Sequence, residues 1–309
     1  MPKSLIHPLA WHRCGLVAGL ALAALAQGAI ARNAPDFAPP TGFGAAPAMV
    51  DSAVTGQGAT AGHTYADLVD LAIASPIVVR AVVHRQSRLK PVDSPGLQPG
   101  FARLYIEADT AALLVGPELG ESLRFLADVP VDANGRVAKL AKTPVLLFGR
   151  AVPGKPGELQ LTAADTMLPW SAALEARLRA ILTELVNPDA PPRIVALREA
   201  VHVPGNLTGE GETQFFFATD GGKPVSISVV RRPGEPTRWG VSFTELVDQA
   251  ASPPQPESLA WYRLACSLPP AIPDRAAISA TDADKQIAVE DYVMVRQALG
   301  PCTRNHAGG

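Results

Sequence analysis

The sequence predicts an α+β protein built from two β-rich units. Its 309 residues are enough for two domains of ordinary size, and a hydrophobic fraction of 47% can supply their cores. Only 6% of the residues are aromatic, whereas 30 prolines and 26 glycines indicate many turns. Strand-like alternation of apolar and polar residues also recurs along most of the chain. We expect an N-terminal five-stranded, barrel-like domain and a C-terminal antiparallel β-meander with two packed helices.

The N-terminus has the order of a secretory signal peptide. Basic residues precede an uncharged apolar run at residues 15–26, and small residues follow it. This pattern predicts a signal peptide over residues 1–31, cleaved after Ala31, with Ala26 as a second possible site. A permanent membrane anchor is the alternative, although the run is shorter than the ~20 residues of a membrane span. We therefore expect a soluble bacterial protein, periplasmic or secreted, with no transmembrane segment after cleavage.

The charge of the mature chain argues against nucleic acid as a partner. The full chain has a formal charge of -2, and residues 1–31 carry Lys3 and Arg13 but no acid. Their removal from the 27 basic residues leaves 25 against 29 acidic residues, a net charge of -4. Such a chain lacks the overall basic field that nucleic acid or an anionic membrane demands.

Residues 63–187 are expected to form the first domain. Residues 32–62 are mostly Ala, Gly and Pro without any period, which predicts a disordered linker before it. Helical spacing of apolar residues predicts a short helix at 65–75, and a longer one from Trp170 to Val186 that closes the domain. Between the helices, alternation or short apolar runs predict five strands, at 77–89, 102–116, 123–131, 145–148 and 159–163.

Three segments of this domain resemble a known family. They read Ser-Pro-Ile-Val-Val-Arg-Ala-Val-Val at 75–83, Ala-Ala-Leu-Leu-Val-Gly at 111–116 and Lys-Thr-Pro-Val-Leu-Leu-Phe-Gly at 142–149. In this order they are similar to the strands of netrin-like OB-fold domains, over about residues 66–164. The resemblance implies a small barrel. It implies no inhibitory or binding activity, because the matching residues are core and turn positions.

Residues 188–309 are expected to form the second domain. A strand is predicted at 194–203, and a Gly-rich loop follows at 204–211. The clearest local pattern is a β-hairpin at 212–232, in which two runs of strand formers flank Asp-Gly-Gly-Lys. A further strand completes the meander, and two helices follow, the second with Thr281 as its N-cap. These last elements are predicted at 239–243, 257–268 and 282–299.

The cysteines predict one disulfide. Cys14 lies in the signal peptide, so Cys266 and Cys302 remain in the mature chain. An even count in an oxidising compartment favours a bond between them, which would tie the ends of the two C-terminal helices together. Two buried free thiols are the alternative.

No catalytic or metal-binding motif stands out. The histidines and cysteines lack the paired spacing of a zinc site, and no Gly-x-Ser-x-Gly or Ser-x-x-Lys motif marks a nucleophile. His63 and His306 fall near the chain ends, which leaves His84 and His202 as possible bases. We therefore expect no metal, no cofactor and a non-catalytic binding module for an envelope protein or a small ligand. A periplasmic hydrolase with a His/carboxylate site is the alternative.

The strongest binding candidates lie around the last turn of the meander. Arg231, Arg232 and Arg238 flank this turn, and Trp239 follows. Arginine beside tryptophan is the composition of an interface anchor. The alternative is a strand end with Trp239 in the core.

Two weaker candidate pairs lie elsewhere. Glu210 and Glu212 stand beside glycines before the hairpin and could line a site, or could be ordinary exposed acids. Arg80 and His84 share the polar face of the first strand, which would suit an anion. The alternative for that pair is a solvated strand face.

Overall fold

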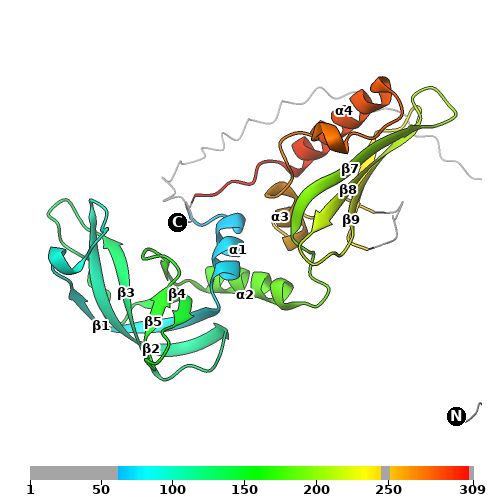
Figure 1. Ribbon diagram of the computed structural model, residues 1–309. Helices are drawn as coiled ribbons and strands as arrows, with labels where there is room; N and C mark the ends of the chain where they lie inside the picture. The colour runs from blue at the N-terminus through cyan, green and yellow to red at the C-terminus, as the bar shows by residue number, and fades with distance from the viewer. Residues whose placement is uncertain (1–61, 245–250, 306–309) are drawn as a thin grey trace, which may run out of the picture. The chain divides into compact units, whose positions relative to one another are not determined.

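The computed structural model describes residues 62–244 and 251–305 (Figure 1). The predicted signal peptide, the linker up to residue 61 and His306 lie outside the described residues. The α+β class is confirmed, because helices accompany two separate antiparallel sheets. None of the helices in these two ranges is long and apolar enough to cross a membrane.

The first sheet has six strands in the order β3-β2-β1-β4-β5, and β6 also pairs with β4. All five predicted strands are present. The sequence did not predict β6, a three-residue strand that continues the edge of β4 beyond β5. The bounds are β1 Ile77–Arg88, β2 Phe101–Val115, β3 Ser122–Pro130, β4 Pro144–Ala151, β5 Leu159–Leu161 and β6 Met167–Pro169.

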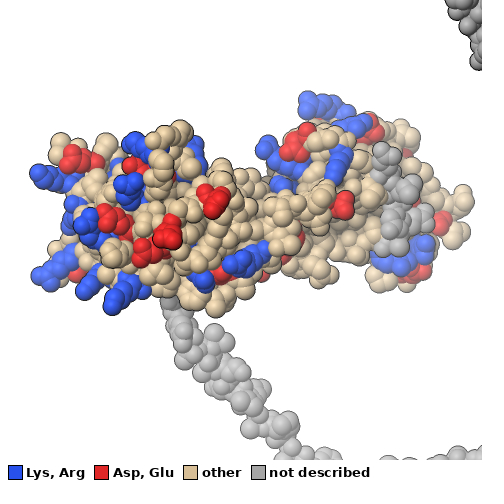
Figure 2. Space-filling model, turned by 90° about the horizontal axis from the view of Figure 1, so that it is seen from below, with Lys and Arg blue, Asp and Glu red and all other residues tan. Residues whose placement is uncertain are grey.

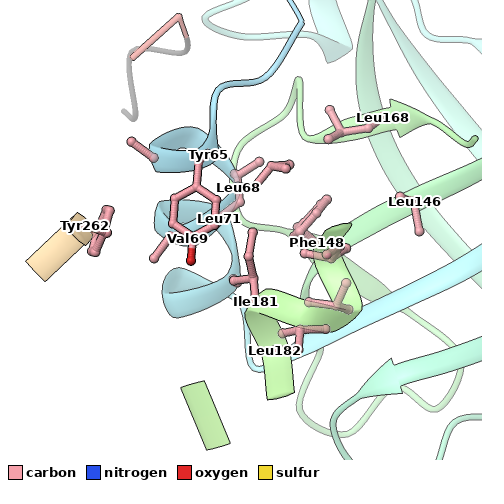
Figure 3. Close-up of a cluster of buried hydrophobic side chains, with 14 of the residues drawn as sticks. Tyr65, Leu68, Val69, Leu71, Leu146, Phe148, Leu168, Ile181, Leu182 and Tyr262 are labelled. Carbon is pink, nitrogen blue, oxygen red and sulfur yellow. The ribbon is translucent and has the colours of Figure 1, made fainter. Parts of the chain in front are cut away.

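Both faces of β1 and β4 are covered. Val79 and Leu147 belong to a buried cluster on one face, which all the longer strands of this sheet share. Val78 and Phe148 point to the other face, where α1 and α2 pack on them (Figure 3). The uninterrupted apolar run of β4, expected for a strand buried on both sides, is fully buried.

Side-chain caps fix the starts of α1 (Tyr65–Ala74) and α2 (Ala172–Val186). Thr64 and Asp67 form a capping box at the first turn of α1. Ser171 accepts a hydrogen bond from the Leu174 N–H at the start of α2. Helical spacing of Leu178 and Ile181 then presents a buried stripe to the sheet.

Hydrogen bonds also connect strands at the two ends of the first sheet. The Arg124 N–H of β3 donates to the Gly157 oxygen over 2.8 Å, and Asp128 N–H donates to the Ala164 oxygen over 2.7 Å. An isolated bridge pairs Arg124 with Glu158, just before β5. The sheet therefore curls far enough for β3 to meet the segment around β5.

The second sheet is the predicted meander, with strand order β10-β9-β8-β7. Gly222 has a φ of 72° in the hairpin turn, a conformation that glycine adopts without strain. Phe215, Ile227 and Val229 point to one face, which α4 and α3 cover (Figure 1). The bounds are β7 Ile194–Pro204, β8 Gly211–Thr219, β9 Val225–Arg231, β10 Arg238–Ser242, α3 Leu259–Ala265 and α4 Asp282–Leu299.

The predicted disulfide is present as a Cys266–Cys302 pair with an S–S distance of 2.06 Å. It joins the C-terminal ends of α3 and α4. One helix differs from expectation in what it packs against. Leu259 and Tyr262 of α3 lie in the buried cluster of α1 and α2, whereas Leu264 lies in the cluster of the second sheet. The helix α3 therefore contributes to the core beneath both sheets.

Candidate functional site

The face of the second sheet opposite the helices is the candidate site. Strand register determines which side chains meet there, because directly paired residues point to the same face. Paired residues form three rows across the sheet, ordered from β7 to β10. The rows are Val203, Glu212, Val230 and Arg238; then Val201, Gln214, Ser228 and Gly240; then Glu199, Phe216, Ser226 and Ser242.

A groove of about 1350 Å³ lies on this face. Small residues in the middle row, Ser228 and Gly240, keep its floor low, while Gln214 and Phe216 add a polar and an apolar group. The loop after β7 and the segment Ala251–Pro253 also line it. This volume exceeds the roughly 300–1,000 Å³ of common small-molecule sites.

Gly240 allows the groove wall to form. A Cβ at this position would collide with the Ala251 carbonyl, so only glycine lets that backbone lie on β10. The Val241 N–H then donates to the Ser252 oxygen over 3.3 Å, which covers part of the outer edge of β10. On the opposite edge, β7 receives the Ile278 N–H at the Ala200 oxygen, 3.0 Å away. Both edges are therefore partly occupied, and the groove lies between them over the buried Ser228 and Gly240.

The three arginines at the groove have different roles. Arg231 donates to the Asp291 carboxylate of α4, whose side chain is fully buried, so it is tied to the scaffold. Arg238 pairs with Glu235 over 3.0 Å at the surface. The Arg232 side chain is exposed and makes no hydrogen bond or ion pair with any described residue. Arg232 is therefore the guanidinium most available to a ligand.

The two glutamates also differ. The Glu210 carboxylate accepts hydrogen bonds from the N–H groups of Asn206 and Leu207, at 3.1 and 3.2 Å, and so holds its own loop together. Glu212 accepts a bond of 2.8 Å from the Gln214 amide and lies in the first row of the open face. The groove thus has an acid near β8 and arginines near β10.

Trp239 lies beside this site but faces the other way. Register pairs it with Val229, and its ring packs against the core on the helix face. Its contacts are those expected of a core tryptophan. All six residues predicted around the hairpin and the last turn nevertheless line one groove, namely Glu210, Glu212, Arg231, Arg232, Arg238 and Trp239.

Arg80 and His84 are not brought to the groove. Arg80 forms an ion pair of 3.0 Å with the buried Glu175 of α2 and stacks over the Trp170 ring. The hydrogen bond from the Trp170 indole lowers the pKa of Glu175, and Arg179 and Arg80 act in the same direction. His84 is exposed, with Nδ1 3.9 Å from the Asp109 carboxylate. These contacts hold α2 on the sheet and leave His84 at the surface.

His202 belongs to a buried hydrogen-bond chain on the helix face. Its Nδ1 lies 2.8 Å from the Thr213 hydroxyl, and that hydroxyl donates to Asp291 over 2.5 Å. Because Thr213 gives its proton to the carboxylate, its oxygen accepts from His202, which places the imidazole proton on Nδ1. His202 is only 4% exposed and lies on the opposite side of the sheet from the groove.

Several groove residues were not singled out from the sequence. Gln214, Phe216 and Ser228 line the groove, and the buried Asp291 anchors Arg231. The available signal was the alternation of serines with the core residues of β9, which shows that its second face carries small polar groups. No signal marked Asp291, since a carboxylate on a helix is normally exposed.

Comparison with known proteins does not assign the chain to a class. No protein-family model matches the sequence, and no curated protein matches it significantly. Among residues 62–244 and 251–305, no group of three or more His, Cys, Asp or Glu side chains could hold a metal ion. The class is therefore described by fold and site alone: an α+β protein with an open, grooved sheet face.

Proposed function

We propose that this chain is an exported, non-catalytic binding module of the bacterial cell envelope that holds a partner in the groove of the second sheet. The observation that carries the proposal is the groove on this face. Three rows of side chains with small central residues form a floor, and two chain segments wall it. Export from the cell remains the expectation drawn from the N-terminal sequence.

The groove suits an extended segment of a partner protein. Its volume exceeds that of most small-molecule sites. The floor offers apolar contact at Phe216 and hydrogen bonds at Gln214 and Ser228, and Arg238 lies in the same row as Glu212, two strands away. Strand addition is disfavoured, because segments of the same chain already bond to both outer strands. The side chains of the face, rather than edge backbone groups, would then select the partner.

The OB-like barrel expected for residues 66–164 is a second part of the proposal. Its support is the contact of β3 with the segment around β5, through the Arg124 and Asp128 N–H groups. In this arrangement the first unit is a scaffold and the second provides the groove.

The hydrolase alternative has less support. It needs a base beside an accessible reacting group. His202 does lie beside a hydroxyl, but Thr213 and Asp291 are fully buried on the helix face. The hydrogen bonds from His202 through Thr213 to Asp291 are better suited to joining α4 to the sheet.

Photo-crosslinking in intact cells tests the groove. A photoreactive residue placed at Gln214 should give one adduct of defined mass with an envelope protein, and mass spectrometry would identify the partner. The same residue at Gln286, exposed on α4, is the control. Adding Arg232→Glu should reduce the Gln214 adduct without changing the melting temperature, since the Arg232 guanidinium has no partner among the described residues. An identical adduct from both positions, or none from Gln214, would refute the proposal.

A further inference from the structure

A basic surface lies at one end of the first sheet. None of its residues lines the groove of the second sheet. Hydrogen bonds place the connection after β3 along the end of β1: Arg88 donates to the Gly135 oxygen, and Gln86 bonds to Ala138 and Leu140. The Lys142 N–H donates to the Val83 oxygen over 2.7 Å. We call the exposed cations on these adjoining segments the basic end; they are Arg85, Arg88, Lys90, Arg136, Lys139 and Lys142.

Most of these cations lack a carboxylate partner. Within the described residues, Arg85 alone among them forms an ion pair, with Glu107 at 2.6 Å. Asp132, the acid within the connection, accepts the N–H groups of Asn134 and Arg136 and so serves its own turn. Figure 2 shows Lys and Arg atoms gathering at the left-hand end of the view, over the first sheet. Exposed cations without local partners create an attractive field for a surface of negative charge.

An exposed apolar side chain accompanies this charge. The connection from β1 to β2 contains a short 3-10 turn, η1 (Pro91–Asp93), immediately after Lys90. Val92 in this turn is 83% exposed, the most exposed of the large hydrophobic residues described. Asp93, the next residue, is acidic. An apolar tip next to several cations is the composition of an interfacial membrane contact, where the tip enters the headgroup region and the cations meet lipid phosphates.

We propose that the basic end docks on the surface of a bilayer rich in anionic phospholipid, with Val92 entering the interface and Lys90, Arg136, Lys139 and Lys142 facing the lipid phosphates. The net charge of the chain does not predict this surface, because most of the acids lie on other segments. The docking is independent of the groove. It would hold the protein at a membrane while the second sheet stays available to its partner.

Vesicle co-sedimentation of the mature protein tests the docking. Vesicles of equal parts phosphatidylcholine and phosphatidylglycerol should bind it, pure phosphatidylcholine should not, and binding should fall as salt rises. Lys139→Glu with Lys142→Glu should weaken binding roughly thirtyfold or more. Val92→Ser should weaken it severalfold while leaving the salt dependence unchanged. The matched control, Arg198→Glu with Arg275→Glu on the second unit, makes the same charge change and should bind as wild type.

Each of the following four outcomes would overturn the proposal. Equal binding to both vesicle types would remove the role of lipid charge. An equal loss in the control variant would show that only total charge matters. Competition by inorganic phosphate beyond that of chloride at equal ionic strength would indicate a small-anion site. Tighter binding to duplex DNA than to the anionic vesicles would indicate a nucleic-acid surface instead.

Discussion

Arg231 at the end of β9 donates two hydrogen bonds to one oxygen of Asp291 on α4. The other carboxylate oxygen accepts from Thr213 of β8. The arginine lines the groove on one side of the sheet and bonds to a helix on the other. The buried Asp291 carboxylate of α4 therefore joins a groove-lining arginine of β9 to a hydroxyl of β8.

Removal of the Arg231 side chain and removal of the Asp291 side chain should lower the free energy of unfolding by different amounts. Among the described side chains, Arg231→Ala leaves the buried Asp291 carboxylate with Thr213 alone as a partner, and it should lower the free energy of unfolding by about 3 kcal/mol. Asp291→Ala should cost less, because the guanidinium left behind is one-third exposed and can turn to water. Urea denaturation measures both. As a control, Arg238→Ala breaks an exposed pair and should change stability by no more than about 1 kcal/mol. The reverse order of the two main variants would contradict this account.

The disulfide should stabilise the fold mainly by restricting the unfolded chain. Cys266 and Cys302 are separated by 36 residues, and a closed loop of this length corresponds to about 4 kcal/mol in the chain-entropy account. A Cys266→Ala/Cys302→Ala variant should therefore unfold at lower urea concentration. Reductant should shift the wild-type midpoint and leave the variant unchanged. Two reactive thiols in the denatured, unreduced wild type would show that the bond does not form.

Much of the fold could be predicted, because local patterns agree with the final packing. The alternation of Val225, Ile227 and Val229 with Ser226 and Ser228 indicates which face of β9 packs on the core. The last helix begins at Asp282 and ends at Leu299, as predicted from Thr281 and the Gly-Pro that follows. The pattern could not predict β6, which is only three residues long and depends on pairing with β4.

The site was harder to predict, because its residues are defined by what they meet across the fold. Glu175 carries a carboxylate, a group that is normally exposed on a helix, yet it is buried against Trp170, Arg80 and Arg179. Trp239 was weighed as an interface anchor, but register turns it toward the core. Contacts with other elements bury Glu175, and strand register orients Trp239. Neither can be derived from one helix or strand considered alone.

Glu175 should make stability sensitive to acid. Its pKa is lowered mainly by the Trp170 indole and then by Arg179 and Arg80, so the fold favours the carboxylate. The stabilisation is fully present above the unfolded pKa of about 4.3 and is lost as pH falls through the lower folded pKa. The stability gap between wild type and Glu175→Gln should hold at neutral pH and shrink below about pH 4.3. A gap that is constant with pH would contradict this assignment.

Tyr262 should contribute to unfolding in alkali. Burial, with a hydrogen bond to Asp70, raises its pKa to about 12, so the fold favours the neutral phenol. Its stabilisation is full below the unfolded pKa of about 10 and is lost as pH rises toward 12. Phenolate absorbance followed with circular dichroism should show Tyr262 ionising together with loss of structure. Tyr262→Phe should unfold less steeply over this window, although it loses the bond to Asp70.

Gly240 should control the shape of the groove. A methyl group at this position would overlap the Ala251 carbonyl, so Gly240→Ala forces Ala251–Pro253 away from β10. Overpacking of this kind costs roughly 1–3 kcal/mol, and the displaced wall should also reduce crosslinking from Gln214. Gly221→Ala is the matched control, because its Cβ would enter open space. If Gly240→Ala lost stability but kept the full Gln214 adduct, the wall would not be needed for binding, and the partner would be held by the floor of the sheet alone.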